Sequence, residues 1–373
     1  MTTAAIRSSR PWASVAAFIG LVAATVAFAP GSRASADGLM KGLKSYKGSI
    51  NESSQEAVII FHDAKRPGDA VEDLILKVFV QGKAKEDVKN FAWIVPFPNE
   101  PTVEKEDPKL FEELHNYVER RLAARAKKPQ LKGGKGGAGG ALGGVEVLAK
   151  KVVGAFDVAI VREKEKGALN KWLDTEGYQT IDDADDVLAF YREKNYVFAC
   201  IKVTEAQLNR KEPAGLHPLR FTFKTGGRDG IFFPMKLTGL QTEPFDVNLY
   251  VFYRWWLNDH LSKFGYEHRG FTRRYRDWDT KFCKPDAGKK YYAPEKDHFL
   301  KSYAGGIPTV VKLMQKLHPR QQYYLTNIYA SRLDPAEVRK WKNDLWLFPY
   351  YTNRSMVPYD ARSGGPAAVT RQK

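Results

Sequence analysis

The chain has 373 residues, of which 43% are hydrophobic and 13% aromatic, and its formal net charge is +16. This length and hydrophobic share predict a globular protein with a large core, in one large domain or two ordinary ones, and exclude a small scaffold that depends on disulfides. The high aromatic share favours packed β structure or a surface that contacts sugars or another polymer.

A secretory signal peptide is predicted over residues 1–36. Arg7 and Arg10 form a positive start, an apolar run follows over 12–29, and residues 34–36 (Ala-Ser-Ala) are a small-x-small cleavage signature. A permanent anchor helix is the alternative, although the apolar run is slightly short for a membrane span. In both cases the rest of the chain leaves the cytoplasm, which argues against a cytosolic enzyme.

Cleavage after the leader would leave Asp37 as the mature N-terminus. No later apolar stretch approaches the length of a transmembrane helix, so we expect no such helix after cleavage. The protein is therefore expected in the periplasm or outside the cell.

The first half of the mature chain is predicted to contain several strands and one long helix. Strands are expected at 57–61, 74–80 and 91–98, and the last of these ends or lies at an edge because Pro96 and Pro98 cannot donate to a ladder. Asp107 and Pro108 then open a helix. Its apolar stripe consists of Leu110, Leu114, Val118 and Leu122.

The second half continues with a mixture of strands and helices. Strands are expected at 155–161, 196–203, 220–224 and 245–254, and helices at 167–175, at 183–194 and from Asp334 onward. The predicted fold class is α+β, with a largely antiparallel β-sheet core and several flanking helices. Residues 37–353 are predicted to form a single large domain, and 354–373 a disordered tail.

Three blocks of this chain, together, resemble a known family. They are Phe91–Pro98, the stretch from Trp172 to Val203 that includes Gly177-Tyr178, and His217–Phe223 followed by Phe233-Pro-Met-Lys-Leu237. Their order and spacing resemble a bacterial family of exported proteins known as domain of unknown function 2330, over residues 50–350. The resemblance implies an exported protein with one large α+β domain, and it brings no activity with it.

The glycine-rich run at 132–144 contains a formal match to G-x-G-x-x-G at Gly134–Gly139. A dinucleotide site needs a strand before this motif and a helix after it, and neither is predicted here. Lys135 is followed by Gly136 instead of Ser or Thr, which excludes a P-loop. We therefore expect a flexible surface loop and no cofactor.

The strongest binding candidate is the basic-aromatic region 254–290. Ten Lys and Arg residues there oppose five acids, and eight aromatic residues lie between them. Cations attract phosphate, sulfate or uronate groups, and aromatic faces stack on sugars or bases. The alternative is that the aromatic residues form core and the charges a solvated rim. The residues expected to contact a polyanion are Arg269, Arg273, Arg274, Arg276, Tyr275 and Trp278.

Catalytic and metal chemistry gain little support from spacing. His260, His268, Cys283 and His298 fall close together but show no tight ligand pair, so no metal site is expected there. No G-x-S-x-G occurs, and a pairing of Cys283 with His298 or His260 stays open. The two cysteines, Cys200 and Cys283, would form one disulfide after export or remain unbonded.

Four aspartates within 182–186 could be taken for glycosidase carboxylates. They coincide with the start of a predicted helix, where negative charge favours the positive end of the dipole, and this structural explanation is preferred.

The sequence thus favours a secreted or periplasmic, non-enzymatic binding or structural protein of the bacterial envelope. Its expected partners are an acidic glycan, an anionic membrane surface or an envelope protein, and export argues against nucleic acid. The alternative is an exported hydrolase whose catalytic residues no motif reveals.

Overall fold

The computed structural model describes residues 38–44, 54–62, 64, 68–77, 91–123, 146–203, 217–226, 230–253, 271–276, 283–285, 292–294, 306–318, 323–347, 359–360 and 365–366. In some of the strand segments only the backbone is described. All of these residues belong to one compact unit, Ser32–Lys373.

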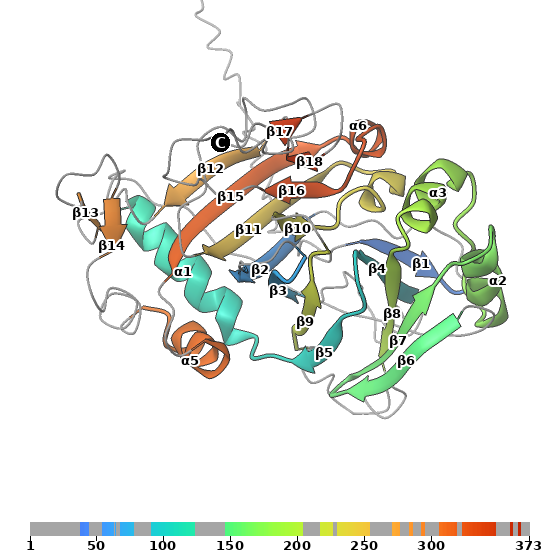
Figure 1. Cartoon of the computed structure of the whole chain (residues 1–373), viewed down its shortest axis with the longest axis horizontal. Helices are drawn as coiled ribbons and strands as arrows, with labels where there is room; N and C mark the ends of the chain where they lie inside the picture. Colours follow the sequence, from blue (N-terminus) through green and yellow to red (C-terminus); the bar gives the residue numbers. More distant parts are fainter. Residues whose placement is uncertain are drawn as a thin grey trace, which may run out of the picture. The chain divides into compact units, whose positions relative to one another are not determined.

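A seven-stranded sheet forms the centre of the structure, in the order β12-β15-β11-β2-β3-β9-β5 (Figure 1). Neighbouring strands are antiparallel except β2 and β11, which are parallel. The strands are β2 Ser54–His62, β3 Val71–Leu76, β5 Thr102–Lys105, β9 Leu219–Lys224, β11 Phe245–Tyr253, β12 Phe271–Arg276 and β15 Tyr324–Leu333.

A second, five-stranded antiparallel sheet has the order β1-β4-β8-β7-β6. Its strands are β1 Leu39–Gly42, β4 Phe91–Phe97, β6 Glu146–Val153, β7 Phe156–Arg162 and β8 Val197–Val203. Three short pairs complete the described β structure: β10 Ile231–Phe233 with β16 Leu345–Leu347, β13 Cys283–Pro285 with β14 Tyr292–Pro294, and β17 Tyr359–Asp360 with β18 Gly365–Pro366.

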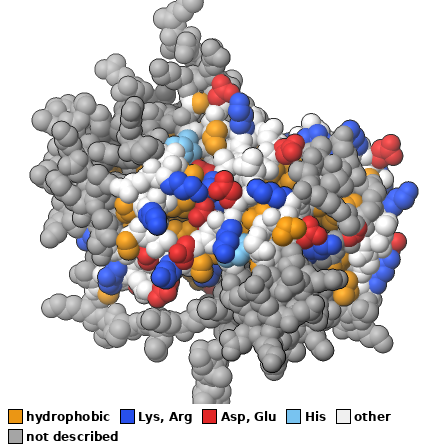
Figure 2. All heavy atoms as spheres, turned by 90° about the horizontal axis from the view of Figure 1, so that it is seen from below, with side chains coloured by type: hydrophobic (Ala, Val, Ile, Leu, Met, Phe, Trp, Pro, Cys, Tyr) orange, Lys and Arg blue, Asp and Glu red, His pale blue; other side chains and the backbone are white. Residues whose placement is uncertain are grey.

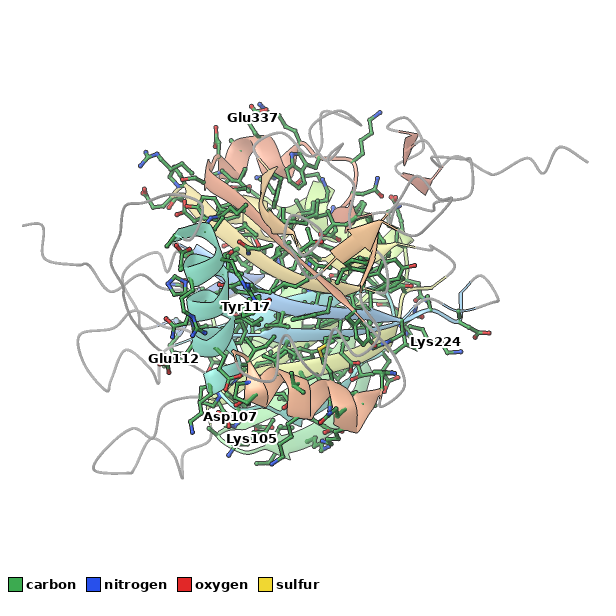
Figure 3. All side chains as sticks on the ribbon, turned by 90° about the vertical axis from the view of Figure 1, so that its left-hand side faces the viewer. Lys105, Asp107, Glu112, Tyr117, Lys224 and Glu337 are labelled. Atoms are coloured by element: carbon green, nitrogen blue, oxygen red, sulfur yellow. The ribbon has the colours of Figure 1, made fainter. Side chains whose placement is uncertain are left out.

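The described helices lie on the outside of these sheets. They are α1 Lys109–Ala123, α2 Ala168–Thr175, α3 Asp185–Glu193, α5 Pro308–Leu317 and α6 Pro335–Arg339, with a 3₁₀ turn, η2, at Thr238–Leu240. Figure 3 shows α1 and α5 over the same face of the seven-stranded sheet, with Tyr117 turned toward the sheet and Glu112 away from it. Among the described residues, no helix combines the length and apolar character needed to cross a bilayer.

Alternation along the strands divides the core into two clusters. In β11, Val247, Leu249 and Val251 join a large cluster that also takes in the second sheet, α2 and α3. On the opposite face of the seven-stranded sheet, Ile60 and Phe252 pack with the apolar sides of α1 and α5. A period of two therefore gives each central strand two buried faces.

The expected α+β class and largely antiparallel sheet are confirmed. The predicted helix start is confirmed by Asp107 Oδ1, which accepts a hydrogen bond from Lys109 N at 2.9 Å, and Asp334 likewise accepts from Ala336 N. Pro96 lies near the end of β4, beyond the pairing with β1, which ends at Ile94. The proline therefore interrupts no ladder on that side.

Several predictions fall partly or wholly outside the described residues. These include Val78–Val80 of the strand that begins in β3, the glycine-rich run 132–144 and most of the tail 354–373, in which β17 and β18 are placed. The expected domain boundaries stay a prediction.

Candidate functional site

A row of polar side chains lies on the face of the seven-stranded sheet that α1 and α5 cover. Strand alternation puts His62, Asp73 and Arg220 on this face together with Ile60 and Ile75, which pack under the helices. The register places Asp73 opposite Ile60 on one side and Thr222 on the other. The polar side chains thus lie next to Ile60 and Ile75, beside the apolar contact between the sheet and the two helices.

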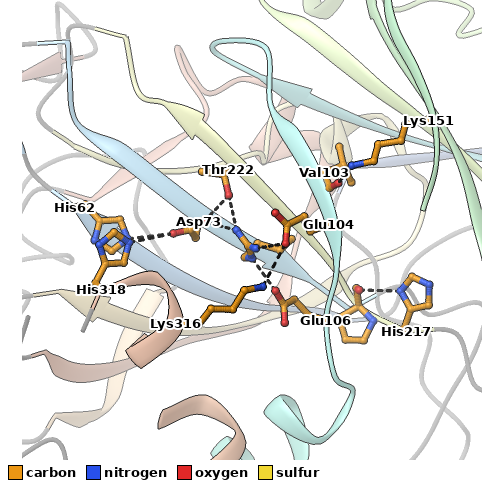
Figure 4. Close-up of polar contacts among 12 residues, drawn as sticks. His62, Asp73, Val103, Glu104, Glu106, Lys151, His217, Thr222, Lys316 and His318 are labelled. Carbon is orange, nitrogen blue, oxygen red and sulfur yellow. Dashed lines mark hydrogen bonds and ion pairs between the residues drawn. The ribbon is translucent and has the colours of Figure 1, made fainter. Parts of the chain in front are cut away.

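Asp73 is the centre of this group, which Figure 4 shows in close-up. Its side chain is 1% exposed. Oδ1 accepts a hydrogen bond from Arg220 Nη1 at 2.9 Å and another from the Thr222 hydroxyl. Oδ2 lies 3.1 Å from His62 Nε2 and 3.7 Å from Nε2 of His318, the residue that follows α5.

Asp73 is an ionised carboxylate in spite of its burial. Burial acts to raise the pKa of this group, but hydrogen bonding to His318, His62 and Thr222 outweighs that effect and holds the pKa well below its usual range. A buried negative charge of this kind requires partners that donate or carry positive charge.

The two imidazoles stack against each other beside Oδ2. Their ring centroids are 3.4 Å apart and their planes differ by 27°. His62 Nδ1 lies 2.8 Å from the Tyr323 hydroxyl, so a neutral ring with its hydrogen on Nε2 satisfies both contacts. The His62 side chain is 10% exposed, whereas that of His318 is 30% exposed. Solvent therefore reaches the group from the His318 side.

Arg220 joins Asp73 to two further carboxylates. Nη2 lies 2.7 Å from Glu104 Oε2, and Nε lies 2.7 Å from Glu106 Oε1. Burial acts to lower the pKa of Arg220, yet the bonds to Glu106 and Asp73 raise it overall, so the guanidinium stays charged. Lys316, on α5, lies 3.5 Å from Glu104 Oε2.

The side chains linked to Asp73 together carry more negative than positive charge. Asp73, Glu104 and Glu106 supply three carboxylates, while Arg220 and Lys316 supply two basic side chains. With both imidazoles neutral the formal charge is −1, in a chain whose net charge is +16. The arrangement is therefore suited to hold one further cation or to exchange a proton through an imidazole. We call His62, Asp73 and His318 the His–Asp–His group.

Most of the side chains predicted to contact a polyanion lie outside the described residues. Arg269 and Trp278 are not described, and of the four on β12 only the side chain of Arg274 is placed. Its Nη2 lies 2.6 Å from Glu119 Oε1 on α1, and its guanidinium carbon lies 5.4 Å from the centre of the Tyr329 ring. Arg274 thus ties the edge strand β12 to α1.

The structure describes few of the histidines and cysteines considered for metal binding or catalysis. His260, His268 and His298 lie outside the described residues, and so does the side chain of Cys283. Cys200 is a free thiol in β8, and burial raises its pKa, which disfavours the nucleophilic thiolate.

The clustered aspartates open α3, as expected from their position. Asp185 and Asp186 lie in the first turn of this helix. Asp186 Oδ1 lies 2.7 Å from Arg339 Nη2, and this hydrogen bond is the main reason that its pKa is lowered. These observations give the cluster a structural role at the helix start.

Two comparisons with known proteins give no match: none of the curated proteins and none of the solved structures matches this chain. A family model for an uncharacterised protein conserved in bacteria, domain of unknown function 2330, matches residues 52–341. The chain belongs to this family. The matched range of the domain of unknown function 2330 begins before His62 and ends after His318, so it contains the whole His–Asp–His group.

The described surface also has a cavity that the His–Asp–His group does not line. A cavity of about 420 Å³ is lined by Lys109, Glu112, Glu113, Asn116, Arg120 and Gly306, on α1 and before α5. The carboxylate of Glu113 already accepts hydrogen bonds from the backbone amide and the hydroxyl of Thr309. The cavity is lined by charged surface residues of both signs. We therefore take the His–Asp–His group, and not this cavity, as the candidate functional site.

Proposed function

We propose that this member of the family is a non-enzymatic binding protein of the bacterial envelope that contacts an anionic polymer or surface. The leader at 1–36 supports export, and Asp37 is the mature N-terminus in this proposal. Mass spectrometry of the protein recovered from periplasm and medium tests the export step, since a mass that still includes the leader contradicts cleavage.

The distribution of charge carries the proposal. The region 254–290 has ten Lys and Arg against five Asp and Glu, a net charge of +5 within 37 residues. Figure 2 shows both signs mixed on the face seen from below. The described side chains of that face therefore show no concentration of positive charge like that of 254–290.

A local concentration of positive charge favours an anionic partner at that place. Ten basic side chains within 37 residues attract phosphate, sulfate or uronate groups. Arg274 supports the assignment because its contacts with Glu119 and Tyr329 fix β12 on the edge of the sheet. Arg273 and Arg276 lie on the same strand.

The test measures binding of the purified protein to heparin, to vesicles containing phosphatidylglycerol and to double-stranded DNA at rising salt. The double variant Arg273→Ala/Arg276→Ala should bind heparin about 10-fold more weakly and show a shallower salt dependence. Lys340→Ala/Lys342→Ala removes the same charge from an exposed surface outside 254–290 and should bind as the wild type does.

Failure to bind heparin or vesicles at low salt contradicts the proposal. Equal losses in the two double variants also contradict it, because the effect would then follow net charge alone. Preferential binding to DNA would replace the acidic glycan or membrane by nucleic acid as the partner.

One observation favours a second function, hydrolysis outside the cytoplasm. An ionised Asp73 lies beside the partly exposed imidazole of His318, and an imidazole oriented by a carboxylate is a common general base. Assay of the protein with chromogenic ester, phosphate and glycoside substrates tests this function. Activity that His318→Ala abolishes would support it, and absence of activity on all three substrate classes would count against it.

A further inference from the structure

Four buried carboxylates of the described core differ in what surrounds them. Glu163 accepts hydrogen bonds from Gly167 N and Leu169 N and pairs with Arg192, so it serves the start of α2. Asp344 accepts from Tyr191 and from two backbone amides, and Glu72 accepts from Phe232 N. Asp73 alone among these four has one oxygen facing two imidazoles.

The three donor atoms of the His–Asp–His group form a compact set. His62 Nε2 and His318 Nε2 lie 3.1 Å and 3.7 Å from Asp73 Oδ2, and all three atoms lie within 4.8 Å of one another. Metal–ligand bonds of about 2.1 Å in tetrahedral geometry place neighbouring ligand atoms about 3.4 Å apart. Two of the three separations already bracket that value.

We propose that the His–Asp–His group binds one divalent first-row transition metal ion, such as Zn²⁺. Two imidazole nitrogens and one carboxylate oxygen are a ligand set that suits such ions and leaves a fourth position open. This proposal is independent of polyanion binding, because the His–Asp–His group shares no residue with the region 254–290.

Hydrogen bonds from neighbouring residues orient two of the proposed ligands, Asp73 and His62, as outer contacts do in metal sites. Asp73 Oδ1 is fixed by Arg220 and Thr222, which leaves Oδ2 for the ion. When His62 Nε2 gives up its hydrogen to bind, Nδ1 carries it and donates to the Tyr323 hydroxyl oxygen, 2.8 Å away. A hydroxyl both donates and accepts, so the contact persists in either tautomer.

Charge and access also favour a cation. The surrounding carboxylates and cations leave a formal charge of −1, in a region where Asp73 and Arg220 are 1% and 5% exposed at the side chain. The stacked rings cannot both direct an Nε2 lone pair to one point, so one of them must turn on binding. His318 is the ring that turns, because it is 30% exposed and follows the end of α5, whereas Tyr323 holds His62.

The experiment titrates the purified full chain, first stripped with a chelator, with Zn²⁺ by calorimetry and with Co²⁺ by visible absorption. The wild type should bind one ion and give the intense bands of tetrahedral Co²⁺. His318→Ala should weaken binding by about 100-fold, and Tyr323→Phe by about 10-fold, since outer contacts tune affinity by this order. His115→Ala, a change on α1 outside the group, should bind as the wild type does.

Circular dichroism and thermal unfolding of each variant in chelator establish that the fold is retained before affinities are compared. No binding by the folded wild type overturns the proposal. Binding that His318→Ala leaves unchanged, or that His115→Ala reduces equally, also overturns it, because the ion would then lie elsewhere.

Discussion

His217 has a different role from the histidines of the His–Asp–His group. Its Nε2 accepts a hydrogen bond from Ala155 N at 3.0 Å, and Nδ1 donates to Pro218 O at 3.0 Å, so the ring is neutral. Gly154, at φ +61°, is so close that a Cβ there would lie 2.2 Å from His217 Nε2. The ring therefore fastens the turn between β6 and β7 to the start of β9.

Replacing His217 by Ala should lower stability and remove part of its acid sensitivity. Loss of the acceptor leaves a buried amide unpaired, at a cost of about 1–3 kcal/mol in the free energy of unfolding. Burial is the main cause that lowers the pKa of His217 from 6.5. As pH falls below that value the unfolded chain takes up a proton that the folded chain does not, so stability decreases.

Urea unfolding at neutral pH and at about pH 5 measures both effects. The wild type and His115→Ala should lose stability on acidification by similar amounts, and His217→Ala by less. Parallel losses in all three proteins would show that His217 is not the group responsible.

Two substitutions of Asp344 should differ in how much they change the stability of the fold. Oδ1 accepts from the Tyr191 hydroxyl, Met235 N and Lys236 N, whereas buried Oδ2 has no hydrogen-bond partner among the described residues. Asp344→Asn keeps the accepting oxygen and should change the free energy of unfolding at pH 7 by less than about 1 kcal/mol. Asp344→Ala leaves three donors unpaired and should cost about 3 kcal/mol or more.

The Asn variant should also remove a decline of stability with rising pH. Burial raises the pKa of Asp344 above 3.8, so as pH rises through that window the unfolded chain releases a proton before the folded chain does, and stability falls. Urea unfolding of both variants between about pH 4 and pH 7 measures this slope. A slope retained in Asp344→Asn would assign it to another buried carboxyl, such as Glu72, whose pKa burial also raises.

Among the elements, α1 and α5 are joined by a cap that comes from a neighbouring helix. Glu113 of α1 accepts hydrogen bonds from Thr309 N at 2.8 Å and from the Thr309 hydroxyl, in the first turn of α5. The carboxylate thus satisfies donors that the residue at the N-cap, Ile307, cannot. His318 follows the opposite end of α5, so this helix connects the cap to the His–Asp–His group.

Removing the cap should loosen α5 and the group together. Glu113→Ala should cost about 1–2 kcal/mol in unfolding free energy and weaken metal binding. Glu112→Ala makes the same change of charge on the exposed face of α1 and should do neither. Urea unfolding and Zn²⁺ calorimetry on both variants provide the measurement, and equal effects of the two would refute the capping role.

The elements that the sequence predicts well are those with local signals. Asp107, Pro108 and a four-residue apolar stripe predict α1, and strict alternation predicts β11. Helix α5 is not predicted, although Pro308 at its start and Val310, Val311 and Met314 at helical spacing are signals of the same kind. Its cap lies on α1, so no capping residue stands before it in the sequence.

At the scale of the whole molecule, the sequence does not reveal the His–Asp–His group. His62 ends β2, Asp73 lies in β3 and His318 follows α5, and no spacing rule connects segments that only the sheet register and the position of α5 bring together. The histidines that spacing does bring together, His260, His268 and His298, lie outside the described residues. Motif searches favour local clusters, whereas this group depends on tertiary structure.

Salt should affect stability and polyanion binding differently. The ion pairs around Arg220 are buried, so screening should change the stability of the fold little. Heparin binding by the basic region 254–290 should instead fall steeply between about 50 and 200 mM salt, because each contact releases counter-ions. Thermal unfolding and heparin affinity measured over the same salt series should therefore diverge. A thermal midpoint that rises markedly with salt would contradict this prediction, because it would show that positive charges repel one another within the folded protein.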